Sequence, residues 1–358
     1  MKNSRKFIQV FFIVLALFLA FHLFVWFFFT SKIFNTDPYY IGDLARMGYQ
    51  IDSLSPRKDS CTLPKRYLTK TSWDGKNVDV VTIGDSFSNG GAKGSNPYYQ
   101  DYLATKYNVK VLNVQSWDLK YDYIDIVNIL ANNGWIEKIR PKAIIIETVQ
   151  REVVNRYAKE HDFALNIPLH DVEKKLFDRA WGEYVPNVSL VNTGNYKYVY
   201  YASMYKYKEH VEKDVYKFSL KQPLFSVKAD TTLLVYADEI TRLDQQISPN
   251  LQKVNDNLNK LAQKLNKQHV KLYFLVPVDK YDLYYDYLVN QQYGRNMFFD
   301  YFKKLKKEYV LIDTKEILLP YVQKGVKDIF YADDTHWSYK ASDIITNDKV
   351  MKEMSTIE

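Results

Sequence analysis

The sequence predicts an α/β fold in which a doubly wound parallel sheet is flanked by helices and preceded by one transmembrane helix. Short β-branched apolar runs alternate with segments of helical periodicity from residue 78 onward, and the first of these runs stops at a Gly-Asp-Ser turn. A long apolar run lies close to the N-terminus. These observations divide the chain into a cytoplasmic tip and anchor at residues 1–30, a lead-in segment at residues 31–76 and a main domain at residues 77–358.

The apolar run at residues 7–29 predicts a membrane anchor. Only Gln9 and His22 interrupt it, and at about 1.5 Å of rise per residue it can cross a hydrocarbon core about 30 Å thick. A cleavable signal peptide is the competing interpretation, but the run is long for one and no small-x-small cleavage site follows it. An uncleaved anchor is therefore favoured, and we expect His22 to face a partner helix.

The charges beside this run predict its orientation. Lys2, Arg5 and Lys6 precede it, and basic residues collect on the cytoplasmic side of membrane helices. The N-terminus is therefore expected in the cytoplasm. The main domain is then extracytoplasmic, in the periplasm or at the cell surface.

The lead-in segment at residues 31–76 has scattered Pro and Gly and no sustained periodicity, so we expect it to wrap on the domain surface. Residues 37–46 are too rich in aromatic and apolar side chains for a free linker, and we expect them to be ordered. Cys61 is the only cysteine of the chain. It cannot form an internal disulfide, and we interpret it as a structural residue.

The first half of the sheet is predicted by strands that alternate with helices. Residues 78–83 read as the first strand, followed by a helix at 98–107 and a second strand at 109–114. A helix at 121–132 then leads to residues 143–148, the clearest buried strand. Since this order is that of parallel strands joined by crossover helices, it predicts a flavodoxin-like sheet with helices on both faces.

The alternation pauses at residues 156–236, a segment rich in Tyr and Lys. It contains an alternating tyrosine run at 196–201 and a stretch of helical spacing at 172–181. An insertion of this size between sheet elements is either a lid or substrate-recognition region, or a decorated surface patch.

The alternation then resumes and completes the sheet. Residues 248–265 read as an amphipathic helix, 269–276 as a strand and 296–308 as a helix. Residues 309–313 read as the last strand and 338–347 as a closing helix. The first and last strands therefore end at the same edge of a parallel sheet.

Chemistry-bearing residues follow these two strands. Ser86 lies at the carboxyl end of the first strand, where open α/β sheets place their ligands. His336 follows the last strand, directly after Asp333, Asp334 and a threonine. Nucleophilic acyl transfer needs a hydroxyl, an imidazole to take its proton and a carboxylate to hold the imidazole tautomer, and these residues supply all three.

The Gly-Asp-Ser turn ending at Ser86, with Asp-Thr-His-Trp at residues 334–337, resembles the SGNH (GDSL-type) hydrolase superfamily. The Asp-Thr-His-Trp segment at residues 334–337 is similar to that of the SGNH-like domains of alginate O-acetyltransferases and other cell-surface polysaccharide O-acetyltransferases. The resemblance covers roughly residues 78–347 without the insertion. The triad acid lies three residues before the histidine in SGNH enzymes generally, here Asp333, and two before it in the acetyltransferase type, here Asp334, which we favour.

The oxyanion-hole blocks depart from the superfamily pattern. The second block usually offers a glycine, but residues 112–117 contain none and present Gln115 and Ser116 instead. The third block usually reads Gly-x-Asn-Asp, whereas residues 147–152 resemble the Glu- and Arg-bearing segment of the acetyltransferase-like members. The Ser86 N–H would then stabilise the oxyanion, aided by Arg151 or Gln150.

Two of these residues have structural interpretations of equal weight. Arg151 either assists the oxyanion or forms a salt bridge with Glu147 or Glu152. Trp337 either positions the histidine or the sugar, or is a buried core residue.

The resemblance implies an extracytoplasmic O-acetyltransferase with an acetyl-serine intermediate and a polysaccharide acceptor. No cofactor is expected to be bound, and the acetyl donor would be relayed by a multi-spanning membrane acyltransferase partner. An esterase that removes acyl groups from surface glycans or lipids uses the same residues with water as acceptor. A non-catalytic assembly subunit of an exopolysaccharide complex is the third possibility.

Other function classes lack support in the sequence. The formal charge of +7 is spread among acidic residues without a basic stripe, which argues against nucleic-acid binding. The six histidines show no metal-ligand spacing such as His-Glu-x-x-His, so no metal site is expected. There is also no P-loop and no Gly-x-Gly-x-x-Gly opening a helix.

Overall fold

The computed structural model describes residues 2–34, 41–179, 189–212 and 214–357. Two sequence predictions extend outside this part of the chain. The expected order of residues 37–46 can be followed from Ile41 only, and the helical spacing at 172–181 can be followed as far as Arg179.

Five parallel strands form the central sheet, in the order β2-β1-β3-β7-β8. The strands are β1 (Val80–Ile83), β2 (Val111–Asn113), β3 (Ala143–Glu147), β7 (Lys271–Val276) and β8 (Val310–Asp313). Every residue of β1 and β3 is buried, as expected for strands covered on both faces. The predicted fold class is confirmed, and all five predicted strands are present with slightly shorter bounds.

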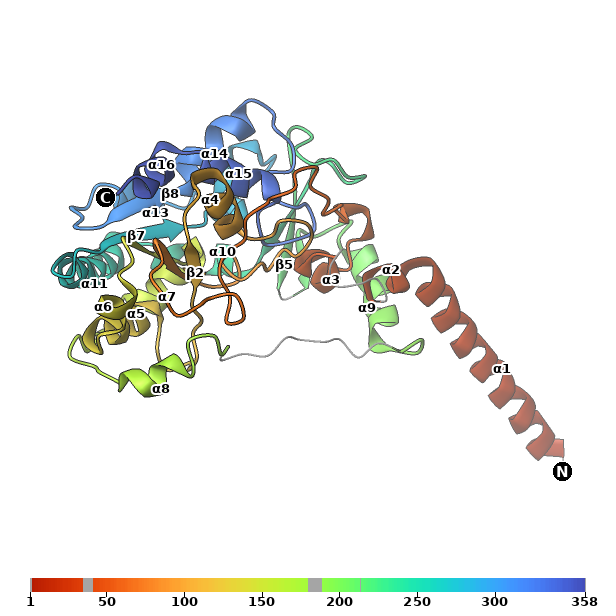
Figure 1. The fold of residues 1–358 in the computed structure, drawn as a ribbon. Coiled ribbons are helices and arrows are strands. Elements are labelled where there is room, and N and C mark those ends of the chain that lie inside the picture. The colour runs from red at the N-terminus through yellow and green to blue at the C-terminus, as the bar shows by residue number, and fades with distance from the viewer. Residues whose placement is uncertain (1, 35–40, 180–188, 213, 358) are drawn as a thin grey trace.

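Helices cover both faces of this sheet (Figure 1). One layer contains α4 (Tyr99–Tyr107), α14 (Thr314–Gln323), α15 (Tyr339–Thr346) and α16 (Lys349–Ser355). The other contains α5 (Tyr123–Asn132), α6 (Trp135–Ile139), α7 (Val153–Tyr157) and α11 (Ser248–Asn266), with α13 (Phe298–Phe302) packed on α11. The apolar stripe of α11 is fully buried against the sheet and these neighbours, which is why its periodicity is so clear in the sequence.

Two C-terminal elements differ from the sequence prediction. The helix expected at 296–308 is only the short α13, because the chain turns after Phe302. α14 was not anticipated: it starts directly after β8, with the Asp313 carboxylate accepting the Glu316 N–H, and it continues past Pro320. A proline normally marks the end of a helix, so the pattern concealed this one.

The insertion forms a small second sheet and several helices. Its antiparallel strands are β4 (His210–Glu212), β5 (Val215–Ser219) and β6 (Thr232–Tyr236), paired in that order. The alternating tyrosine run at 196–201 is helical and lies in α9 (Thr193–Met204). The helical spacing after residue 172 gives only the end of α8 (Leu169–Glu173), followed by turns. The short helix α10 (Asp238–Thr241) follows β6, and the short helix α12 (Lys280–Tyr284) follows β7.

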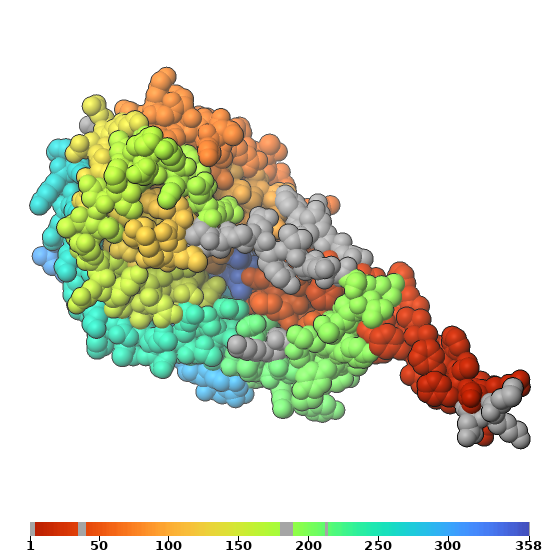
Figure 2. Space-filling view, turned by 90° about the horizontal axis from the view of Figure 1, so that it is seen from below, coloured from red at the N-terminus to blue at the C-terminus, as the bar shows by residue number. Residues whose placement is uncertain are grey.

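The N-terminal helix projects from the domain as a narrow stalk (Figures 1 and 2). α1 (Lys2–Val25) continues through a π-helical turn at Trp26–Thr30 into α2 (Ser31–Phe34). Within the described residues it is the one helix long and apolar enough to cross a membrane. Its apolar side chains are mostly exposed, whereas His22 is buried against α9, so the partner helix expected for His22 belongs to this chain.

The lead-in segment packs closely on the main domain. It forms α3 (Asp43–Gly48), which contacts β5 and β6, and a 3₁₀ turn at Ile51–Ser53. The Ala45 N–H donates to the Asp333 carbonyl over 3.0 Å, and the Ala332 N–H donates to Ser55 Oγ over 2.9 Å. The segment is therefore an integral support of the loop between α14 and α15, beyond the surface wrapping expected from its composition.

Candidate active site

Ser86 follows β1 in a tight turn that a buried carboxyl group holds in place. Glu147, the last residue of β3, accepts the N–H groups of Asp85 and Ser88 on its Oε2, each over 3.0 Å. A Cβ atom at Gly84 would lie 2.3 Å from this oxygen, so only glycine permits the approach. The turn leaves Ser86 exposed to solvent at the carboxyl edge of the sheet.

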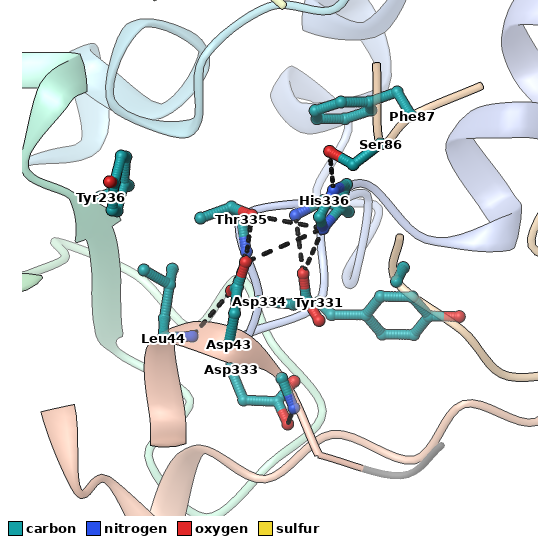
Figure 3. A network of polar contacts seen from close by, with 12 residues as sticks. Asp43, Leu44, Ser86, Phe87, Tyr236, Tyr331, Asp333, Asp334, Thr335 and His336 are labelled. Carbon is teal, nitrogen blue, oxygen red and sulfur yellow. Dashed lines mark hydrogen bonds and ion pairs between the residues drawn. The ribbon is translucent and has the colours of Figure 1, made fainter. Parts of the chain in front are cut away.

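Ser86, His336 and Asp334 form a continuous hydrogen-bonded chain (Figure 3). His336 Nε2 lies 2.6 Å from Ser86 Oγ, and His336 Nδ1 lies 2.6 Å from Asp334 Oδ1. Asp334 Oδ1 also accepts the His336 backbone N–H over 3.0 Å. This is the arrangement of a nucleophile, a general base and an orienting acid.

Opposite charges set the protonation of this chain. Burial alone would raise the pKa of Asp334, but His336 and Arg57 outweigh it and hold that pKa well below its usual range. Burial would lower the pKa of His336, but the Asp334 carboxylate outweighs it and raises that pKa above 6.5. Asp334 is therefore ionised at neutral pH and strengthens His336 as a base.

Of the two candidate acids, Asp334 contacts the histidine and Asp333 does not. Asp333 is fully buried and pairs with Arg57 Nη2 over 3.0 Å, while its Oδ2 accepts the Gly42 N–H over 2.9 Å. Arg57 Nη2 also reaches Asp334 Oδ2 at 2.9 Å. Asp333 thus anchors the arginine that in turn holds Asp334.

The sequence reasoning missed three residues that support the histidine loop. Asp43 accepts the Thr335 N–H over 2.8 Å and its hydroxyl over 2.5 Å, and its Oδ2 lies 4.0 Å from His336 Nδ1 (Figure 3). Lys280 is fully buried and donates to the carbonyl oxygens of three loop residues, Tyr331, Ala332 and Asp334. Together with Arg57, these residues come from segments without a local pattern that marks them as site residues.

Gly91 lets the backbone approach the reactive pair. Its N–H donates to the Ser86 carbonyl over 2.7 Å. A Cβ atom at this position would lie 2.4 Å from His336 Nε2 and 2.9 Å from Ser86 Cβ. The Gly-rich turn after Ser86 was the sequence signal for this close approach.

The four side chains proposed for the oxyanion hole have other partners or none. Gln115 Nε2 donates to Asn89 Oδ1 over 2.8 Å, and Ser116 is buried without a hydrogen bond among the described residues. Gln150 Nε2 donates to Asp282 over 2.9 Å. By contrast, no hydrogen bond from the Ser86 N–H is found among the described residues.

Arg151 takes the salt-bridge role, with partners other than those expected. It donates to Asp279 over 2.8 Å and lies 3.9 Å from Glu239. Glu152 pairs instead with Arg242, and Glu147 faces the Ser86 turn.

Trp337 is a buried core residue that packs on Phe87, which in turn contacts the His336 ring. Its ring meets the edge of Phe87 at 4.8 Å between centroids, and Phe87 lies 4.7 Å from the His336 ring. Trp337 therefore positions His336 through Phe87, out of reach of the cleft.

Ser86 and His336 open into a polar cleft of about 1120 Å³. Two tyrosines, Tyr67 and Tyr98, line it with ring centroids 4.9 Å apart. Its walls come from the lead-in segment and from the loop after Ser86, and its basic residues are Arg66, Lys93 and Arg179. The cleft therefore offers aromatic rings and polar side chains of both charges to a ligand.

Two groups of carboxylates and a histidine are close enough to share a metal ion. The first is Asp43, Asp334 and His336, whose facing atoms already hydrogen-bond one another or Thr335. The second is Asp122, Asp125 and His161, in which the two aspartates form the capping box of α5 and His161 pairs with Asp125. Hydrogen bonds account for the first group. In the second, Asp122 Oδ2 forms an ion pair with Lys159 at 3.0 Å, and His161 Nε2 is buried without a hydrogen-bond partner among the described residues.

Cys61 lines the same cleft and is exposed.

Neither a scan against protein-family models nor a search of curated proteins gives a match to this chain.

Proposed function

We propose that this protein is a membrane-anchored extracytoplasmic O-acetyltransferase of the SGNH type that acetylates a cell-surface or exported polysaccharide. The observation that carries the proposal is the hydrogen-bonded chain from Ser86 through His336 to Asp334 at the mouth of a polar cleft. The acid two residues before the histidine is the spacing that resembles the alginate-acetyltransferase type. α1 supplies the anchor, with the N-terminus in the cytoplasm.

In the first half-reaction, His336 Nε2 takes the proton of Ser86 Oγ as this oxygen attacks the acetyl carbonyl of the donor. The carbonyl–donor bond breaks, the donor leaves with the proton from His336, and Ser86 carries the acetyl group. In this proposal the oxyanion is stabilised by the Ser86 N–H, for which no acceptor is found among the described residues.

In the second half-reaction, His336 takes the proton of a sugar hydroxyl, which attacks the acetyl-serine carbonyl. The bond to Ser86 Oγ breaks and His336 returns the proton to it. The donor is relayed by a multi-spanning membrane acyltransferase partner, as the family resemblance implies, and no bound cofactor takes part.

An esterase is the competing function, and one observation favours it: Ser86 is exposed, so water can reach an acetyl-serine as readily as a sugar hydroxyl. Hydrolysis and transfer then differ only in the acceptor.

The nucleophile is tested by labelling the full chain in detergent with a serine-directed fluorophosphonate. Wild type should be labelled and Ser86→Ala should not. Ser95→Ala is the matched control, because Ser95 lines the same cleft without contacting His336, and it should label as wild type does. Absence of labelling in wild type would show that Ser86 is not an activated nucleophile.

Transfer is tested with an acetyl-phenol ester as donor, with and without a polysaccharide acceptor. Acetyl groups should appear on the glycan and phenol release should accelerate with acceptor concentration. A rate of phenol release that no acceptor changes, with free acetate as the product, would support esterase activity instead.

A further inference from the structure

The helix α9 of the insertion lies against the domain end of α1 in both views (Figures 1 and 2). The rings of Phe21 and Tyr196 stack with their centroids 4.9 Å apart, and those of Phe29 and Tyr198 stack at 4.7 Å. Two successive stacked pairs fix α9 to the last turns of the apolar helix.

Polar contacts reinforce this packing. The Asn195 amide donates to His22 Nδ1 over 2.8 Å, and His22 Nε2 lies 3.2 Å from the Tyr196 hydroxyl. Thr30 Oγ1 donates to Asn195 Oδ1 over 2.6 Å. α9 therefore satisfies the one histidine of the apolar helix, which would otherwise face lipid without a partner.

The level of these contacts follows from helix geometry. A hydrocarbon core about 30 Å thick takes about 20 residues of a helix that rises about 1.5 Å per residue. A span that begins at Phe7, directly after the basic residues, ends near Phe27. A tilted helix would need still more residues. The contacts of α9 at Phe21 and His22 therefore fall in the outer part of the hydrocarbon core, about 9 Å or less from its boundary, and the contact at Phe29 falls just beyond it.

The outward face of α9 has the composition of a membrane interface. Tyr196, Val199 and Tyr200 are 49%, 43% and 56% exposed, and their spacing of three and four residues puts them on one side of the helix. Tyrosine rings are enriched at the level of lipid headgroups. Lys197 is also exposed and can extend toward lipid phosphates.

We propose that α9 lies in the headgroup layer of the leaflet from which α1 emerges, with Tyr196, Val199 and Tyr200 in contact with lipid. The tyrosine-rich part of the insertion is then a membrane-seating element that fixes the domain on the bilayer. This inference rests on α1 spanning the membrane and is independent of acyl transfer.

The experiment uses the full chain in lipid nanodiscs that contain phosphatidylglycerol. Cys61→Ser removes the only native thiol, and Val199→Cys then carries a nitroxide label. Lys253→Cys is the matched control, since Lys253 is an exposed position on α11, at the end of the domain away from α1 (Figure 1). Collision rates are measured with oxygen, which partitions into lipid, and with a nickel chelate, which stays in water.

The label at 199 should favour oxygen over the chelate several-fold more than the label at 253. Equal chelate access at the two positions would place α9 in water and overturn the proposal. Protection of position 199 from both reagents would overturn it as well, because a protein partner would then cover this face. Serine labelling of the same variants is measured separately, so a loss of activity cannot be mistaken for a change in membrane contact.

Discussion

Arg57, from the segment before the sheet, forms an ion pair with Asp334, the carboxylate that holds the His336 imidazole; the Nη2–Oδ2 distance is 2.9 Å. The same guanidinium pairs with Asp333 at 3.0 Å and lies 4.6 Å from the centre of the Tyr331 ring. One cation thus pairs with two buried carboxylates in the loop that carries His336.

Replacement of this arginine should be strongly destabilising. Arg57→Leu leaves both carboxylates buried without their cation, which should lower the free energy of unfolding by about 3–5 kcal/mol. Urea denaturation of the full chain in detergent measures the change. Lys228→Ala removes an exposed pair with Asp52 and should cost less than about 1 kcal/mol. Similar values for the two variants would refute a central role for Arg57.

The two adjacent aspartates should separate function from stability. Asp334→Asn replaces the charged, acceptor-only partner of His336 Nδ1 with an amide that can also donate, and should lower turnover of an acetyl ester by about 10²- to 10⁴-fold. Asp333→Asn disturbs the Arg57 pair, so it should reduce the free energy of unfolding while most of the turnover per folded molecule remains. Initial rates, corrected for the active fraction by serine labelling, distinguish the two. The opposite pattern would assign Asp333 as the acid.

The pH dependence of turnover should report His336. The base must be neutral to accept the Ser86 proton, and its pKa is raised above 6.5 chiefly by the Asp334 carboxylate acting against burial. The rate should therefore rise with pH through a midpoint above 6.5. In Asp334→Asn the raising charge is gone, so the residual activity should have a lower midpoint. Profiles of kcat/KM with identical midpoints for both proteins would exclude His336 as the titrating base.

Glu147 should stay protonated to a higher pH in the folded chain than in the unfolded chain. Burial, together with the neighbouring Asp85 carboxylate, raises the pKa of Glu147 well above 4.5, so the folded chain keeps a proton that the unfolded chain releases. Stability from this group is therefore complete below pH 4.5 and declines as the pH rises toward the raised pKa. Glu147→Gln, which imitates the protonated carboxyl, should abolish this part of the pH dependence.

A second substitution tests the role of Glu147 as a hydrogen-bond acceptor. Glu147→Ala removes the acceptor of the Asp85 and Ser88 N–H groups and should cost about 1–3 kcal/mol of stability as well as serine labelling. Serine labelling that survives in Glu147→Ala but is lost in Glu147→Gln would contradict this role. It would mean that the turn does not depend on a neutral acceptor at position 147.

The strands and the residues at their ends could be predicted because their patterns are local. Each buried strand is a short β-branched run, and the turn at Ser86 is marked by the glycines that its backbone needs. The spacing before His336 suggested Asp334, and the structure places that carboxylate on the imidazole.

The supporting residues could not be predicted because their partners are distant in sequence. Arg57 and Asp43 lie in a segment without periodicity, and they contact a loop close to the other end of the chain. The alternating tyrosine run at 196–201 gave no secondary-structure prediction. It is helical, and some of its rings pack on the apolar helix while others are exposed. Pro320 concealed α14 for a related reason, since local propensity yielded to packing against α12 and α15.

The contacts of Asp43 and Arg57 also determine where the chain can be cut. A soluble fragment that starts at residue 77 would keep every strand of the sheet and the whole of Ser86, His336 and Asp334. It would lose the cation between Asp333 and Asp334 and the carboxylate that holds Thr335. A fragment that keeps these contacts must therefore begin before Gly42, so the residues that follow the apolar helix belong with the candidate site.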